Sequence, residues 1–425
     1  MVKKHNPLTK ARNVLRFLHG RIPGQLIIQL TDKCNAKCPQ CGMRVTEKFE
    51  RSKLKLDDVK RMIDAAAEKG VESLSFTGGE TFLFFDDLVA LINHAGQVGI
   101  EYIRTGTNGF LFINSDEASF EKRIGKMAET LAKTKIRNLW ISIDSAEGTL
   151  HEDMRGLPGV IKGIEKALPI FHQHGIYPSV NLGINRNIGG VSNAQGDHRK
   201  FNPDEFYNTY REAFKRFYSF VIDLGFTIVN TCYPMSVDSE SAKGLSAVYG
   251  ATAIDEVIKF SQQERVLLFK ALMDTIPEFR SKIRIFSPRT SLYALIEQYL
   301  GNDSYSYACR GGIDFFFVDA KTGNTYPCGY RGEENFGKLW ELDLNKIDQK
   351  AFCKQCDWEC FRDPSELLGN LLDLYGKPFS TLNRLIKDKE YCNLWTSDLK
   401  YYKACDFFNG RMAPNYDKLA SWQSK

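Results

Sequence analysis

Short apolar runs alternate with longer amphipathic segments through the first half of the chain. Apolar runs predict strands at residues 25–31, 73–79, 102–109, 138–145, 177–185 and 225–233, and amphipathic segments predict helices at residues 56–70, 85–99, 115–133, 158–174 and 203–224. Six strand–helix units whose strands are almost continuously apolar favour a parallel sheet covered by helices. About 210 residues suit a partial barrel better than a complete eightfold barrel, which takes roughly 250. We therefore expect an α/β fold, a partial (β/α)6 TIM-like barrel.

The remainder of the chain has a different character. Residues 236–300 are expected to form a helical connecting region, and residues 301–365 contain five cysteines and a hairpin pattern, FFFVDAKTGNTYPCG, with TGN as its turn. Residues 366–425 form a helix-rich tail. Residues 1–24 form a basic extension, with a helix expected near residues 8–18. This extension has no acidic residue, and its basic residues are Lys3, Lys4, Lys10, Arg12, Arg16 and Arg21.

Composition restricts the function. The 425 residues are 43% hydrophobic and 26% charged, with a net charge of +5, which is too weak a positive balance to indicate nucleic acid. Neither a transmembrane run nor an apolar secretory segment is present in the sequence, so a cytoplasmic location is expected. The basic N-terminus predicts either a helix that covers the barrel bottom or peripheral contact with an anionic membrane.

Eleven cysteines in such a chain require an explanation. Their odd number and tight local spacing argue against a disulfide framework and favour metal ligation. Cys34, Cys38 and Cys41 follow the first strand with the spacing C-x3-C-x2-C. Three thiolates can hold three irons of a 4Fe–4S cube and leave the fourth iron open, as a reactive cluster requires. A structural zinc ion and a purely electron-transferring cluster are the alternatives.

On this loop the chain resembles the radical S-adenosylmethionine (SAM) superfamily. The resemblance implies that Cys34, Cys38 and Cys41 ligate a catalytic 4Fe–4S cluster, whose open iron is chelated by the amino and carboxylate groups of SAM. Gln40 departs from the family, which often has an aromatic residue there.

The resemblance continues along the next strands. Strand two ends in Gly78, Gly79 and Glu80, similar to the family's GGE motif at the SAM amino group, although Thr81 stands where a proline is usual. Strand three ends in Thr107 and Asn108, similar to the family's TNG ending.

Strand four supplies the other half of the expected SAM site. Its ISIDS and HEDMRG segments resemble the family's S-x-D and H-x3-R-G pattern. The resemblance implies that Ser142 and Asp144 lie near the ribose and that Arg155 binds the SAM carboxylate with its guanidinium fork. A surface ion pair with Glu152 is the alternative for Arg155. His151 is expected to fix the loop, and Asn181 on strand five is expected to point to the same mouth.

The C-terminal cysteines resemble the shortened auxiliary-cluster module called a twitch domain, the reduced form of the SPASM domain. The resemblance implies that Cys309, Cys328, Cys353 and Cys356 ligate one auxiliary 4Fe–4S cluster, with Cys360 as a fifth candidate. Cys392 and Cys405 bring the count to the seven of a full SPASM domain, but C-x2-C-x3-C replaces its longer spacing. Two auxiliary clusters, zinc, or no metal at this site are the alternatives.

Together these features predict a radical SAM enzyme. It would cleave SAM reductively, and the 5′-deoxyadenosyl radical would take a hydrogen atom from a substrate, which leads to oxidation, cross-linking or rearrangement. The implied partners are a flavodoxin- or ferredoxin-type electron donor and a small-molecule, lipid or peptide substrate. A non-enzymatic iron–sulfur electron carrier or scaffold is the alternative function. Cys232, at the end of strand six, is either a hydrogen-atom donor or a buried structural residue.

Overall fold

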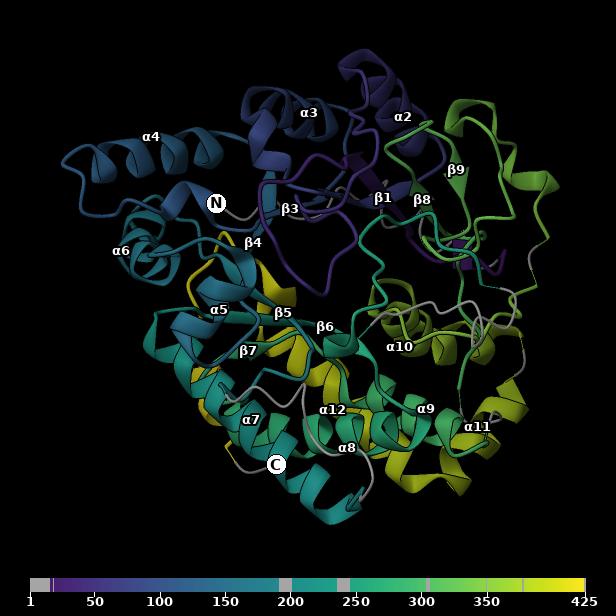
Figure 1. Ribbon diagram of the computed structural model, residues 1–425. Coiled ribbons are helices and arrows are strands. Elements are labelled where there is room, and N and C mark those ends of the chain that lie inside the picture. The colour runs from purple at the N-terminus through teal and green to yellow at the C-terminus, as the bar shows by residue number, and fades with distance from the viewer. Residues whose placement is uncertain are drawn as a thin grey trace.

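One large sheet organises the molecule. The computed structural model describes residues 16–17, 19–190, 201–234, 245–302, 306–348, 350–376 and 378–423. Within these residues the sheet has nine strands in the order β7-β6-β5-β4-β3-β2-β1-β8-β9 (Figure 1). All neighbouring strands are parallel except β8 and β9. The strand order leaves β7 and β9 as open edges, so the expected partial α/β barrel is confirmed.

The six predicted strand–helix units are present, with small shifts of their ends. Their elements are β1 (Gly24–Thr31), α2 (Leu56–Glu68), β2 (Val71–Gly78), α3 (Phe85–Gln97), β3 (Tyr102–Thr107), α4 (Phe120–Lys133), β4 (Ile136–Ser142), α5 (Gly148–Arg155), α6 (Val160–Gln173), β5 (Ser179–Gly183), α7 (Pro203–Asp223) and β6 (Ile228–Cys232). Helix α5 was not predicted. It begins where the Glu147 carboxylate accepts hydrogen bonds from the amides of Thr149 and Leu150, and it ends at Gly156, whose φ is 66°.

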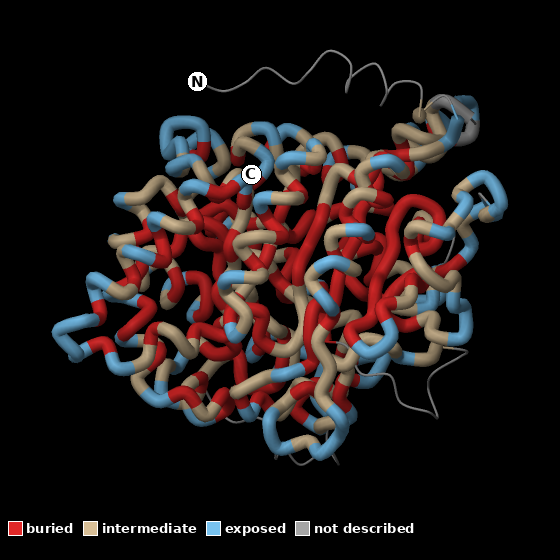
Figure 2. The backbone as a smooth tube through the Cα atoms, turned by 90° about the horizontal axis from the view of Figure 1, so that it is seen from above, coloured by how far each residue is buried: buried red, intermediate tan, exposed pale blue. Residues whose placement is uncertain are grey.

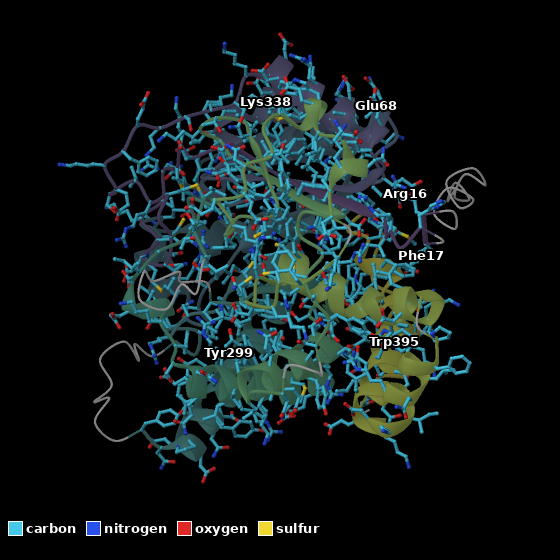
Figure 3. The ribbon with its side chains drawn as sticks, turned by 90° about the vertical axis from the view of Figure 1, so that its right-hand side faces the viewer. Arg16, Phe17, Glu68, Tyr299, Lys338 and Trp395 are labelled. Atoms are coloured by element: carbon cyan, nitrogen blue, oxygen red, sulfur yellow. The ribbon has the colours of Figure 1, made fainter. Side chains whose placement is uncertain are left out.

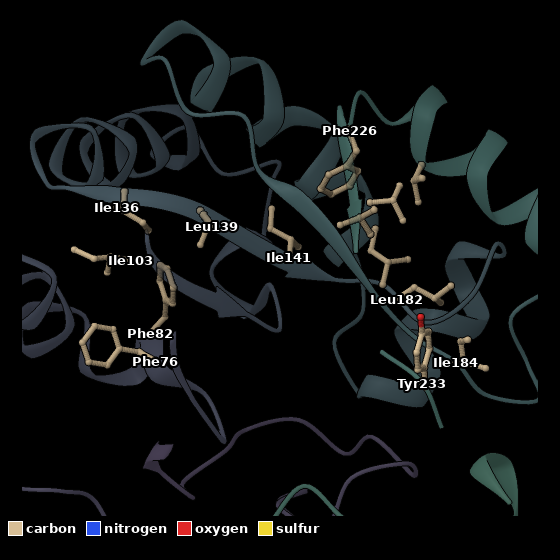
Figure 4. Packing of buried hydrophobic residues seen from close by; sticks show 14 of the residues in the cluster. Phe76, Phe82, Ile103, Ile136, Leu139, Ile141, Leu182, Ile184, Phe226 and Tyr233 are labelled. Atoms are coloured by element: carbon tan, nitrogen blue, oxygen red, sulfur yellow. The ribbon is translucent and has the colours of Figure 1, made fainter. Parts of the chain in front are cut away.

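The expectation of almost continuously apolar strands was wrong for the middle of the sheet. Strand β3 alternates, because Ile103 is fully buried on the helix side whereas Arg104 and Gly106 face a cavity. Figure 4 shows Phe76, Phe82 and Ile103 in the apolar layer on the helix side. The opposite face of β2 to β6 is polar, so the barrel interior is not filled by a second apolar core.

The cysteine-rich region joins the core sheet directly. Strand β8 (Phe315–Val318) pairs in parallel with β1, and β9 (Thr325–Tyr326) completes the predicted hairpin. The inner face of β1 and β8 is apolar, and its Ile27 and Phe317 belong to the same buried cluster as Cys309 and Trp358. The boundary near residue 301 remains a prediction, but the two regions share one sheet.

The rest of the chain is mainly helical, as predicted. Its elements are η4 (Glu256–Ile258), α8 (Gln262–Phe279), β7 (Arg284–Ile285), α9 (Arg289–Tyr299), η6 (Leu339–Glu341), η7 (Leu344–Lys346), α10 (Glu359–Gly376), α11 (Pro378–Lys387), α12 (Lys389–Ala404), η8 (Asp406–Phe408) and α13 (Tyr416–Ala420). The short turns η1 (Thr81–Phe84) and η2 (Phe110–Phe112) follow β2 and β3. In Figure 3, Tyr299 on α9 and Trp395 on α12 lie in the helical half, away from Glu68 on α2.

A fully buried ion pair anchors this helical half. Arg280 follows α8 and pairs with Asp398 on α12, and neither side chain is exposed to solvent. Asp398 also accepts hydrogen bonds from the amide and hydroxyl of Thr290, at 2.8 and 2.7 Å. Because a buried charge without a partner is costly, this pair holds α12 against α9 and the end of α8.

Buried residues follow the sheet and the helix faces turned towards it (Figure 2). Most of the basic extension, with residues 1–15 and 18, lies outside the described residues, and so does most of its predicted helix and any membrane contact. At its end, Arg16 donates a hydrogen bond to the Lys69 carbonyl at 2.8 Å, and Arg21 pairs with Asp314 at 2.6 Å. Among the described helices, none has the length and hydrophobicity needed to cross a bilayer.

Candidate active site

The first cysteine loop lies against the carboxyl end of β2 through backbone hydrogen bonds. The Gly79 amide donates to the Thr31 carbonyl at 2.8 Å, and the Glu80 amide donates to the Lys33 carbonyl at 2.9 Å. A Cβ atom on Gly78 would stand 2.1 Å from the Thr31 oxygen, and one on Gly79 would stand 2.2 Å from the Lys33 oxygen. The glycines of the motif are therefore required by this close approach.

The three thiols of the loop are held as ligands of an iron–sulfur cluster would be. The amides of Ala36 and Met43 donate to the sulfur atoms of Cys34 and Cys41, at 3.5 and 3.4 Å. Burial raises the pKa of Cys38 to about 12 and that of Cys41 to about 11. Thiols buried in this way lose their protons only to a metal, so the donor set suits iron.

Every predicted SAM-site residue meets the cysteine loop in one cavity of about 310 Å³. The cavity is lined by Cys34, Cys38, Cys41, Gly78, Gly79, Glu80, Thr107, Asn108, Ser142, Asp144, Arg155 and Asn181. They come from the ends of β1 to β5 and from α5. Parallel strands bring their carboxyl ends to one edge, which is where ligands of such sheets bind.

Glu80 is buried, and its carboxylate organises the turn after β2. It accepts hydrogen bonds from the amides of Asn108 and Phe82, at 2.6 and 3.0 Å. Burial raises the pKa of Glu80 to about 7, and the two amides partly oppose this shift. A ligand ammonium group near Glu80 would favour its ionised form.

Asp144 connects the cysteine loop to helix α5. Its Oδ2 accepts from Gln40 Nε2 at 2.8 Å, from Arg155 Nε at 2.9 Å and from an Arg155 terminal nitrogen at 2.8 Å. His151 Nδ1 accepts from the Asp144 amide at 3.1 Å, so it does fix this loop. Glu152 instead accepts hydrogen bonds from amides at the start of α6, and it forms no pair with Arg155.

Several polar atoms in this region have no hydrogen-bond partner among the described residues. Gln40 Oε1 and His151 Nε2 are buried without a hydrogen bond, and Arg155 Nη1 has none among the described residues. Buried polar groups are normally satisfied, so these atoms fit a polar ligand such as SAM. Asp144 has only Oδ1 left for a ribose hydroxyl.

The other predicted residues lie on the cavity wall. Asn108 Nδ2 donates to Asn35 Oδ1 at 2.8 Å and lies 3.9 Å from the sulfur of Cys34. Asn181 pairs in register with Ser142 and accepts from Asn230 at 2.6 Å. The hydroxyl of Thr107 accepts from the Gly109 amide at 3.1 Å, which shapes the turn after β3.

Four C-terminal cysteines lie together, as the resemblance implied. The backbones of Cys309 and Cys353 pair as an isolated antiparallel β-bridge. The sulfur atoms of Cys309 and Cys328 accept hydrogen bonds from the amides of Gly311 and Tyr330, both at 3.4 Å. Burial raises the pKa of Cys356 far above its ordinary value, and the neighbouring Cys328, Cys309 and Cys353 raise it further. Such amide-to-sulfur hydrogen bonds are typical of cluster ligands.

Three cysteines stand apart from these four. Cys360 lies in the first turn of helix α10 and lines the cavity. Its thiol donates a hydrogen bond to Glu359 Oε1 at 3.4 Å. Cys405 belongs to a separate buried cluster with Tyr401, and Cys392 lies on α12. The seven-cysteine set of a full SPASM domain is therefore not assembled.

Sequence reasoning missed part of the cavity wall. Arg104, Trp140, Tyr249 and Glu359 also line it, and Cys232 donates to Asn181 Oδ1 at 3.4 Å. Arg104 could have been found from the sequence, since an arginine within a predicted core strand is rare unless it has a function or a partner.

Neither cysteine group has the geometry of a single-ion site. No three Cys, His, Asp or Glu side chains converge as ligands of one metal ion in the described part of the chain. A cube places each thiolate on a different iron, so its ligands stand further apart than those of one zinc ion.

Comparison with known proteins gives the same class. Residues 28–186 match the Radical SAM superfamily. The AdoMet-dependent heme synthase of Oleidesulfovibrio alaskensis is 24% identical over 363 residues, which span 84% of this chain and 82% of the relative. The GTP 3',8-cyclase of Mannheimia succiniciproducens is 30% identical over 154 residues, but these span only 35% of this chain and 42% of the cyclase.

Two solved structures share part of the fold at low similarity. Streptococcus suis SuiB bound to S-adenosylmethionine superimposes with a TM-score of 0.46 at 16% identity, over 79% of this chain and 68% of SuiB. Native anSMEcpe with bound AdoMet, a second abbreviation for SAM, gives a TM-score of 0.47 at 17% identity, over 80% of this chain and 88% of that chain.

The match to the Radical SAM superfamily covers residues 28–186, the part of the chain that holds the cysteine loop and Arg155. This similarity points to an enzyme with a 4Fe–4S cluster and SAM as cofactors, and it speaks against the non-enzymatic electron carrier.

Replacement of Gly79 tests the backbone contact that positions the cysteine loop. Gly79→Ala should lose about four irons per chain, the content of one cube, while remaining folded, because the new Cβ displaces the loop. Gly125→Ala on α4 is the matched control, since nothing lies within 4 Å of its added Cβ. Iron analysis with circular dichroism checks both, and equal iron in the two variants contradicts the assignment.

Proposed function

We propose that this enzyme cleaves SAM reductively and uses the resulting 5′-deoxyadenosyl radical to take a hydrogen atom from a substrate held in the same cavity. The observation that carries the proposal is the meeting of three cluster-type thiols, Glu80 and Arg155 on one wall of that cavity. A cluster held by Cys34, Cys38 and Cys41 would supply one electron to SAM. The protein's own part is to orient SAM and to exclude water.

The charged groups of the cavity suit the two ends of the SAM methionine moiety. Glu80 offers a carboxylate to the ammonium group, and Arg155 offers its free Nη1 to the carboxylate. Asp144 binds Arg155 and is itself held by a hydrogen bond from Gln40, so the Arg155 side chain is preorganised for the contact.

We further propose one auxiliary 4Fe–4S cluster on Cys309, Cys328, Cys353 and Cys356. Their common burial and the two amide-to-sulfur hydrogen bonds support it. Tyr249, Tyr330 and Trp358 stand between this group and the cavity, since they line the cavity and lie in or against the buried cluster of these cysteines. A substrate radical in the cavity therefore has a short route for passing an electron to that cluster.

The relatives support a small-molecule substrate. Relatives that match most of the chain include AdoMet-dependent heme synthases, and relatives that match about a third of it include GTP 3',8-cyclases. A flavodoxin- or ferredoxin-type protein is the proposed electron donor. Oxidation or a cross-link follows if the substrate radical loses an electron to the auxiliary cluster, and rearrangement follows if the radical instead regains a hydrogen atom.

The first test of this function needs no substrate. Dithionite-reduced protein with SAM should form 5′-deoxyadenosine slowly, as read by liquid chromatography and mass spectrometry. Cys38→Ala should abolish the product, because two thiolates do not hold an open cube. Cys392→Ala, on α12, should behave as wild type. Wild-type product formation by Cys38→Ala would remove the cysteine loop from the site.

Iron content separates the two roles assigned to the C-terminal cysteines. Wild-type protein should carry about eight irons per chain, four from each of two cubes. Cys356→Ser should lower this to about four, whereas Cys360→Ser should leave it near eight, since Cys360 lies at the cavity. A loss of four irons in Cys360→Ser would place it among the ligands.

Removal of Arg155 should weaken SAM binding by roughly 30- to 1000-fold, the equivalent of about 2–4 kcal/mol, and leave iron content unchanged. Without Arg155, the Asp144 carboxylate would face the SAM carboxylate unshielded. Arg155→Lys should recover part of the affinity, because it keeps the charge and loses the fork.

The matched control for Arg155→Ala is Lys162→Ala, which removes an exposed ion pair with Asp116. Equilibrium binding at equal iron content compares the three variants with wild type. Unchanged affinity in Arg155→Ala would exclude it from the SAM site without affecting the assignment of the cysteines.

A further inference from the structure

Arg104 is a partly buried cation on the cavity wall that the proposed SAM site does not use. It lies on the inner face of β3, opposite Ser75 in the register of β2. Its Nε donates to Ser75 Oγ at 3.1 Å. No partner of its two terminal nitrogens is recorded among the described residues.

The other cavity arginine, Arg155, has a carboxylate partner within the protein. Arg155 binds the Asp144 carboxylate through two nitrogens. Arg104 has no carboxylate within 4.0 Å among the described residues, although Glu359, Cys232 and Cys360 lie nearby. Burial raises the pKa of Glu359 to about 7 and holds both thiols protonated, so these neighbours neutralise Arg104 poorly.

A buried charge of this kind is costly unless something pairs with it. Burial lowers the pKa of Arg104 below its ordinary value, but a guanidinium stays protonated in proteins. Strained or uncompensated groups that persist in a fold gather at binding sites. No described residue supplies such a partner, so a negatively charged ligand in the cavity would complete the site.

We propose that Arg104 binds a carboxylate group of the substrate and so orients the substrate beside the SAM site. The two free terminal nitrogens form a planar fork that matches the two oxygens of a carboxylate. Cys232, Cys360 and Glu359 complete the polar surroundings of the bound group. The inference rests on the proposed function, because that function makes this cavity the substrate site.

The first test is thermal stability without any ligand. Arg104→Met should melt at the wild-type temperature or above it, because it removes a cation with no carboxylate partner among the described residues and keeps most of the side-chain volume. Arg280→Met is the comparison variant, since Arg280 is fully buried and paired with Asp398. It should melt roughly 5 °C or more below wild type. A comparable loss in Arg104→Met would make Arg104 a structural residue and overturn the proposal.

The second test uses small anions as probes on full-length, iron-loaded protein under anaerobic conditions. Succinate should raise the melting temperature of wild type, succinamide should not, and Arg104→Met should lose the response to succinate. An equal response in both proteins, or to the uncharged amide, overturns the proposal. A response to inorganic phosphate that exceeds that to succinate overturns the choice of carboxylate.

These outcomes are separate from the test of SAM cleavage. Formation of 5′-deoxyadenosine by wild type reports on the proposed function, and the melting experiments do not require it. Active wild type with a destabilised Arg104→Met would therefore reject the anion site alone. Inactive wild type with the expected melting behaviour would reject the function and retain an anion site.

Discussion

The contact between two stretches of backbone holds the site together. Residues 31–33 pass so close to Gly78 and Gly79 that any side chain there would collide with a carbonyl oxygen, and two backbone hydrogen bonds close the gap. This places the cysteine loop at the end of β2, beside the Glu80 carboxylate. Glu80 in turn accepts the Asn108 amide, so the ends of β1, β2 and β3 form one rigid unit.

A second connection runs through Asp144. Gln40 on the cysteine loop and Arg155 on α5 both donate to the same carboxylate oxygen, and His151 accepts from the Asp144 amide. His151 and Arg155 lie four residues apart, so they share one face of α5. Helix α5 therefore links the position of Arg155, the proposed ligand of the SAM carboxylate, to the position of the cysteine loop.

The contrast between the two faces of the sheet explains why the interior is open. Helices cover the apolar outer face, and the cysteine-rich region covers the inner face of β1 and β8 with aromatic side chains. The inner face of β2 to β6 is polar, and burying it without partners would be unfavourable. This face therefore lines a cavity, and its polar groups, Arg104 among them, are placed to bind a ligand.

The sequence by itself determined the parts of this protein that depend on local order. The spacing of Cys34, Cys38 and Cys41, the GGE motif and the regular strand–helix alternation predicted the fold class, the cluster loop and the residues that line the cavity, because parallel strands bring their ends to one edge. Only the tertiary structure decided which groups meet across elements. It paired Arg155 with Asp144, placed Cys360 on the cavity wall, and gave Arg104 no carboxylate partner among the described residues. Such contacts depend on how α5, α10 and β3 pack against their neighbours. Residue spacing along the chain does not give the distance between side chains that packing brings together.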